Sequence, residues 1–171
     1  MGKLALGHGG VLLINNKTGA TKYYEYGRYD KEQKGIVRNV KVSDVVIGED
    51  GKPTVASLNK VLKQLSKRAG EGGKIEGAYV KSDDFEGMNN YAKGKLAEND
   101  DPKRKEYSLF SNNCGTFAAD VVDVDPKAKK VDSNSSKPGS IVSDYQEVFP
   151  SVSYDPKTDK TTVKEVEKKK P

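Results

Sequence analysis

Two side chains, each present once in the chain, are the candidates for chemistry. Cys114 is the single cysteine and His8 the single histidine among 171 residues. A cysteine attacks a carbonyl carbon as a thiolate, and its pKa falls at a helix N-terminus and beside an imidazole. An imidazole can accept the thiol proton and deliver it to a leaving group. The pair therefore predicts acyl-transfer chemistry, with Cys114 as nucleophile and His8 as general base.

The residues around Cys114 predict the start of a helix. Asn113 is a favoured N-cap residue, and Phe117 and Val121 lie on one apolar stripe after it. Cys114 is therefore expected in or next to the first helical turn. Gly115 removes side-chain bulk after the nucleophile, so backbone N–H groups of this turn can approach an oxyanion. We accordingly expect Asn113 and Gly115 to contact substrate.

The residues around His8 predict the first strand of an antiparallel hairpin. His8 lies between glycines at the start of an apolar segment over residues 7–14. Residues 15–19 are polar and suit a turn, and residues 22–29 are rich in strand-favouring tyrosines. The side chains beside His8 on the sheet should therefore come from the 22–29 strand.

Glu25 is the candidate third member of the site. It is the carboxylate of the 22–29 strand that precedes Asp30. A carboxylate that accepts a hydrogen bond from the imidazole N–H orients the ring and stabilises its charged form. Tyr24 and Tyr26 are the alternatives, because a shift of one residue in strand register would exchange the faces.

The remaining periodicities predict a mixed α+β domain. Apolar residues recur at helical spacing after Pro53 and again after Ser82, which is a candidate N-cap. The further expected elements are extended segments within 36–46, a strand over 74–81, a short helix over 141–149, and a hairpin of 151–154 with 161–166. We assign residues 1–150 to a catalytic domain, and residues 151–171 to a terminal hairpin with a partly disordered basic tail.

Composition excludes several classes of site. One cysteine cannot form an internal disulfide, and one cysteine with one histidine cannot form a usual four-ligand zinc site, so no metal or cofactor is expected. The net charge of +5 is spread among 25 acidic residues, which argues against a nucleic-acid partner. No apolar run reaches membrane-spanning length, and residues 1–6 are too short for a secretory signal. We therefore expect synthesis in the cytoplasm, no stable membrane insertion, and export by a secretion apparatus or carrier.

Two motifs resemble those of the circularly permuted NlpC-like hydrolases. They are Gly-His-Gly-Gly-Val-Leu-Leu-Ile at 7–14 and Asn-Asn-Cys-Gly-Thr-Phe-Ala at 112–118, and the resemblance spans roughly residues 7–122. It implies a papain-like α+β fold in which an antiparallel sheet carrying His8 packs against the helix carrying Cys114. Relatives include lecithin:retinol acyltransferase-like enzymes, deubiquitinating-type peptidases and cell-wall amidases delivered by type VI secretion.

The resemblance also implies a function and further site residues. The favoured function is hydrolysis of an amide bond in peptidoglycan peptides by an antibacterial effector delivered to the periplasm of target bacteria, with a cognate immunity protein in the producer. The run over residues 23–29 is similar to the strand of toxin-type members whose aromatic residues line the substrate cleft. Tyr24, Tyr26 and Arg28 are therefore expected to bind substrate.

Three other functions stay open at this point. A lipid acyltransferase or phospholipase would use the same cysteine and histidine. A protease acting on a protein tail would do so as well. In a non-catalytic binding module, Cys114 would be a small buried hydrophobic residue and His8 a structural one.

Overall fold

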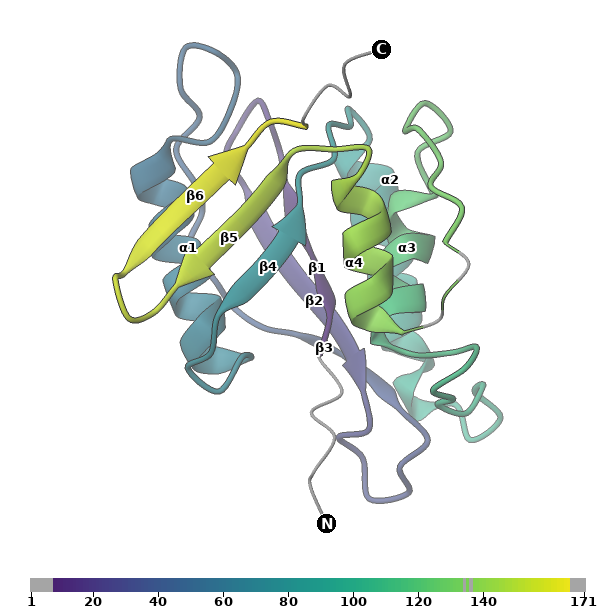
Figure 1. Cartoon of the computed structure of the whole chain (residues 1–171). Coiled ribbons are helices and arrows are strands. Elements are labelled where there is room, and N and C mark those ends of the chain that lie inside the picture. Colours follow the sequence, from purple (N-terminus) through teal and green to yellow (C-terminus); the bar gives the residue numbers. More distant parts are fainter. Residues whose placement is uncertain (1–7, 134, 136, 167–171) are drawn as a thin grey trace.

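The computed structural model describes residues 8–133, 135 and 137–166, and it has α+β architecture (Figure 1). The helices are α1 (Val55–Arg68), α2 (Phe85–Ala97), the 3-10 turn η1 (Glu98–Asp100), α3 (Cys114–Val122) and α4 (Pro138–Gln146). The strands are β1 (Gly10–Ile14), β2 (Thr21–Gly27), β3 (Ile36–Asn39), β4 (Ile75–Ala78), β5 (Ser151–Asp155) and β6 (Lys160–Lys164).

The strands form two antiparallel sheets of three strands, in the orders β1-β2-β3 and β4-β5-β6. In Figure 1 the second sheet crosses in front of the first, with α1 on one side and α2, α3 and α4 together on the other. The predicted C-terminal hairpin is confirmed as β5 and β6. Because β5 also pairs with β4, this hairpin completes a sheet that begins in the middle of the chain. Residues 167–171 of the predicted basic tail lie outside the described residues.

Both faces of the first sheet are covered. Successive side chains of a strand point to opposite faces, so β1 divides its apolar residues between two cores. Val11 and Leu13 pack with α2 and α3, while Leu12 and Ile14 pack with α1 and the second sheet. The short first sheet is therefore held between two layers.

One predicted helix cap is wrong. Asp84, and not Ser82, caps α2, because its carboxylate accepts a hydrogen bond from the backbone N–H of Gly87 at 3.0 Å. The hydroxyl of Ser82 instead accepts from the Asp84 N–H and donates to the carboxylate of Asp125. Ser82 therefore ties the segment before α2 to the segment after α3.

The predicted cap of α3 is confirmed, and Cys114 is the first residue of this helix. The side-chain oxygen of Asn113 accepts hydrogen bonds from the N–H groups of Gly115 at 2.9 Å and Thr116 at 3.1 Å. In return, the Thr116 hydroxyl accepts from the Asn113 N–H at 2.9 Å, which completes a capping box. This local network fixes the direction in which the Cys114 side chain leaves the helix.

Replacing the cap should destabilise the fold. Asn113→Ala removes the acceptor for two N–H groups, so we expect the free energy of unfolding to fall by about 1–2 kcal/mol in urea titrations. Asn113→Asp keeps an oxygen acceptor and should retain most of that stability. Equal losses in both variants would instead assign the effect to the bond that the Asn113 amide donates to the Leu109 carbonyl.

Candidate active site

Strand register places His8, Glu25 and Arg38 on one face at the end of the first sheet. Glu25 is paired with Gly10 of β1 on one side and with Arg38 of β3 on the other. Paired residues of an antiparallel sheet point to the same face, and His8 lies two residues before Gly10. The first sheet therefore brings two side chains, His8 and Arg38, to a fully buried carboxylate, since Glu25 is 0% exposed.

The predicted contact between Glu25 and His8 is present. Oε2 of Glu25 lies 2.8 Å from Nε2 of His8, and the Tyr29 hydroxyl oxygen lies 2.6 Å from the same nitrogen. The Tyr23 hydroxyl donates to Oε2 of Glu25 at 3.3 Å. Gly10 makes room for this arrangement, because a Cβ there would lie 2.3 Å from the Tyr23 hydroxyl. Nε2 is thus fully engaged, and Nδ1 is the ring nitrogen left for the thiol.

Arg38 holds the other oxygen of Glu25. Its Nε donates to Oε1 at 2.8 Å, and one of its terminal nitrogens donates to the same oxygen. Burial by itself would raise the pKa of Glu25, but the hydrogen bonds from His8 and Arg38 outweigh it and hold the pKa below its usual value. The buried carboxylate therefore stays ionised and available to the imidazole.

Cys114 faces His8 from the start of α3. The thiol is not part of a disulfide. Cys114 is 2% exposed, whereas the His8 side chain is 33% exposed. Hydrogen bonding to Cys114, followed by hydrogen bonding to Glu25, raises the pKa of His8 to about 9 against the opposing effect of burial. A Cβ on Gly9 would lie 3.7 Å from the sulfur, so the backbone beside His8 passes close to the thiol. The arrangement favours an imidazolium next to the Cys114 thiol.

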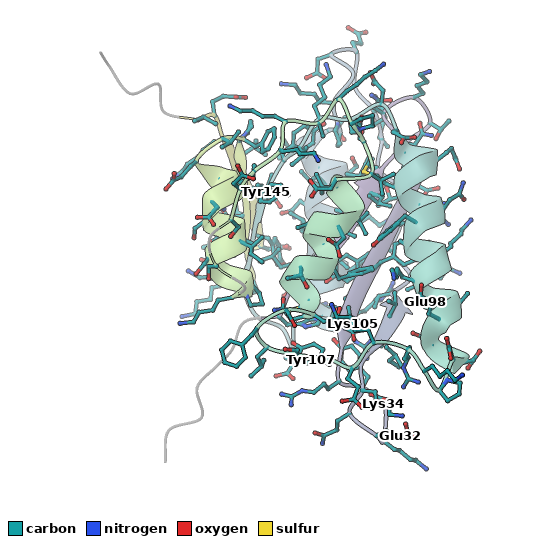
Figure 2. All side chains as sticks on the ribbon, turned by 90° about the vertical axis from the view of Figure 1, so that its right-hand side faces the viewer. Glu32, Lys34, Glu98, Lys105, Tyr107 and Tyr145 are labelled. Atoms are coloured by element: carbon teal, nitrogen blue, oxygen red, sulfur yellow. The ribbon has the colours of Figure 1, made fainter. Side chains whose placement is uncertain are left out.

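Tyr107 is a further polar side chain beside the Cys114 thiol. Its hydroxyl lies beside the thiol and the backbone N–H of Cys114, and burial, with the adjacent Cys114, raises its pKa. Its ring packs on Tyr26 at a centroid distance of 5.4 Å, and the Arg28 guanidinium lies 5.2 Å from its centroid. Figure 2 shows Tyr107 on the same side of the molecule as Lys34 of the β2–β3 loop, whose carbonyl accepts the Tyr107 N–H.

The structure corrects the expectation for Tyr24 and Tyr26, which lie in the core and do not line the site. They are 1% and 8% exposed and pack with α2 and α3. The Tyr24 hydroxyl donates to Asn89 at 2.8 Å, and the Tyr26 hydroxyl donates to the Lys34 carbonyl at 3.3 Å. Because they alternate with Glu25 along β2, they point away from His8, which also removes them as alternatives for the orienting group.

The structure also corrects the roles expected for Asn113 and Gly115. Asn113 is fully buried, and its side chain caps α3. The Gly115 N–H is bonded to Asn113 and is not free for an oxyanion. A Cβ on Gly115 would lie 2.8 Å from the Ile141 side chain, so this glycine allows close packing of α3 on α4. Of the residues expected to contact substrate, exposed Arg28 is the one that the structure leaves accessible beside Tyr107.

Sequence reasoning missed three side chains of the site: Tyr29, Arg38 and Tyr107. The alternation Tyr23, Glu25, Gly27, Tyr29 was a signal for the first, because residues two apart share a strand face. Arg38 required the register between β2 and β3. Tyr107 comes from a loop, and no periodic pattern places a loop side chain.

The described residues contain neither a group of metal ligands nor a helix that could span a membrane. Within residues 8–133, 135 and 137–166, no three His, Cys, Asp or Glu side chains are grouped to hold a metal ion. In the same part of the chain, every helix is too short or too polar to cross a bilayer.

Comparison with known proteins places this geometry in a family. No curated protein matches the chain. A crystal structure of the type VI secretion system effector TseH is 38% identical, with a TM-score of 0.86 over 94% of this chain and 89% of that one. Residues 2–130 match the family described as type VI secretion system effector, TseH-like. The chain therefore belongs to the TseH-like family of type VI secretion system effectors.

Proposed function

We propose that the chain is a cysteine amidase that cleaves amide bonds in peptidoglycan peptides. One observation carries the proposal: the segment before β1, strand β2 and helix α3 bring the single histidine, a buried carboxylate and the single cysteine into one contact network. The order of the His strand before the Cys helix supports a papain-like, circularly permuted NlpC-type fold. In this arrangement Cys114 is the nucleophile, His8 the general base and acid, and Glu25 the orienting group.

The first half-reaction forms an acyl-enzyme. The Cys114 thiolate attacks the amide carbon, the new C–S bond forms, and the carbonyl electron pair moves onto oxygen. The Tyr107 hydroxyl, which lies beside the thiol and accepts the Cys114 N–H, is the candidate donor for this oxyanion. The His8 imidazolium then gives its proton to the departing amine as the C–N bond breaks.

The second half-reaction returns the enzyme to its starting state. His8, now neutral, takes a proton from water as that water attacks the thioester carbon. A second oxyanion collapses, the C–S bond breaks, and the Cys114 thiolate is released from a carboxylic acid product, which loses its proton to solvent. Glu25 stabilises the imidazolium in both halves and is not itself protonated.

The substrate class rests on family and charge. Type VI effectors act in target cells, and a net charge of +5 suits an anionic wall polymer. Delivery to the periplasm by the secretion apparatus would place the protein at peptidoglycan. A producer that makes such an enzyme needs an immunity protein that blocks the site.

The direct test is digestion of purified sacculi, with the released fragments identified by mass spectrometry. We expect new amine and carboxyl termini within the stem or cross-link peptides, and none with Cys114→Ala. Liposomes and a folded protein serve as parallel substrates. If the sacculi stay intact and the liposomes are hydrolysed, the protein is a lipase and not a wall amidase. If the folded protein is cleaved instead, it is a protease.

Removing either member of the pair should abolish hydrolysis. Cys114→Ala and His8→Ala each remove a group that the other needs, so each loss should nearly equal that of the double variant. Turnover of the best wall fragment is the measurement, with circular dichroism as the control for folding. Two moderate losses that multiply in the double variant would contradict a shared mechanism.

Neutralising the orienting carboxylate should cost less than removing the nucleophile. Glu25→Gln keeps the shape and an acceptor oxygen but loses the charge that stabilises the imidazolium, so we expect turnover to fall about ten- to a thousandfold. Tyr24→Phe is the matched control: it removes a buried hydrogen bond to Asn89 on the opposite face and should leave turnover nearly unchanged. An active Glu25→Gln enzyme would remove Glu25 from the mechanism.

The raised pKa of His8 predicts a pH-dependent stability. A folded-state pKa of about 9, above the ordinary 6.5, means that the folded protein binds the extra proton between these values. This stabilisation is complete below pH about 6.5 and is lost as the pH rises through about 9. Urea unfolding across this window should give a falling free energy of unfolding, with a shallower fall in His8→Gln. Equal slopes of the free energy of unfolding against pH in wild type and His8→Gln would contradict a stabilising ion pair between His8 and Glu25.

A further inference from the structure

Arg38 contacts two side chains that both contact His8. Its guanidinium donates two hydrogen bonds to Oε1 of Glu25, and its Cζ lies 3.6 Å from the centroid of the Tyr29 ring. Glu25 and Tyr29 each lie within hydrogen-bond distance of Nε2 of His8. Arg38, Glu25, His8 and Tyr29 thus form a closed ring of contacts, in which each side chain contacts two of the others.

The two carboxylate oxygens of Glu25 have different partners. Oε1 is bonded to Arg38, and Oε2 is left for His8 and Tyr23. A guanidinium is a rigid planar donor, so two bonds to one oxygen restrict rotation of the carboxylate. Cross-strand pairing of Glu25 with Arg38 fixes both backbones as well. The oxygen that faces the imidazole therefore has one position.

The Tyr29 contact restricts the other partner of His8. Tyr29 lies after β2 and is 40% exposed, so few neighbours fix its ring. The ring folds back over Gly27, where a Cβ would lie 2.7 Å from it. The Arg38 guanidinium then lies over the ring as a cation–π partner, which suits a cation with weak hydration. The hydroxyl is thereby held at His8.

We propose that Arg38 is a positioning residue, which holds Glu25 and Tyr29 against His8 and so sets the orientation of the imidazole toward Cys114. It acts through these two side chains and does not contact the reacting atoms. The catalytic meaning of this orientation rests on the proposed amidase function, whereas the coupling of Arg38 to His8 can be measured without it.

Two effects of Arg38 on His8 have opposite signs, which makes the coupling testable. As a nearby positive charge alone, Arg38 would disfavour the imidazolium, so its removal would raise the pKa of His8. As a positioning residue, it keeps Glu25 ionised and aimed at the ring, so its removal would lower that pKa. The polar and charged groups that face this network are Tyr23, Glu25 and Tyr29 from the β2 segment, Arg38 from β3 and Cys114 from α3.

The experiment is an NMR titration of the imidazole signals, which are unambiguous because the chain has one histidine. In Arg38→Met we expect the pKa of His8 to fall by about one unit or more from the wild-type value. Arg68→Met is the matched control, because Arg68 lies at the end of α1 and donates to the Lys41 carbonyl away from the site. It should leave the titration unchanged. A rise or no change in Arg38→Met would overturn the proposal.

Two milder variants keep the test decisive if Arg38→Met does not fold. Arg38→Lys keeps the charge without the planar fork and should give a smaller fall in the pKa of His8. Tyr29→Phe keeps the ring under the guanidinium but removes the hydroxyl, and it should also shift the titration. No shift in either variant would overturn the proposal. Wild-type protein that digests no sacculi while Arg38→Met still lowers the pKa would reject the amidase and retain the positioning role.

Discussion

The burial of one ionised carboxylate is the constraint on which the rest of the site depends. Glu25 has no exposed surface, and an uncompensated charge in that position would be strongly unfavourable. Its compensation comes from His8, which lies just before β1, and from Arg38 of β3. At Glu25 the strands of the first sheet are therefore held together by backbone hydrogen bonds and by ion pairs. The same ion pairs orient the imidazole of His8.

A second set of contacts delivers the thiol to that imidazole. The capping box fixes the start of α3, while the loop before it is bonded to the β2–β3 loop. Arg104 forms a largely buried ion pair with Asp30 at 2.9 Å and donates to the Gly35 carbonyl. These bonds join two loops far apart in the sequence, so Tyr107 and Cys114 are positioned together with the hairpin that carries Glu25.

Much of the fold was predictable because it depends on local patterns. Apolar spacing identified α1, and the Asn113 cap identified the start of α3. The polar turn after β1 implied the hairpin that pairs its strand with β2. Glu25 was found in the same way, since a hairpin brings its neighbours to His8. The part of the candidate site that depends on a helix cap and on one hairpin, namely Cys114, His8 and Glu25, could therefore be predicted from the sequence.

The sequence by itself thus determined which residues lie at the ends of which elements, because caps, turns and periodicity act over a few residues. Only the tertiary structure decided which face of β2 meets the core of α2 and α3. Both faces of the first sheet are covered, so alternation alone does not separate Tyr24 from Glu25. The packing of α3 on α4 also decided that residue 115 must be small, because a Cβ there would lie 2.8 Å from the Ile141 side chain. Arg38 joins the site through the register between β2 and β3, and Tyr107 joins it from a loop bonded to the β2–β3 loop, so both depend on contacts between segments that no local pattern brings together.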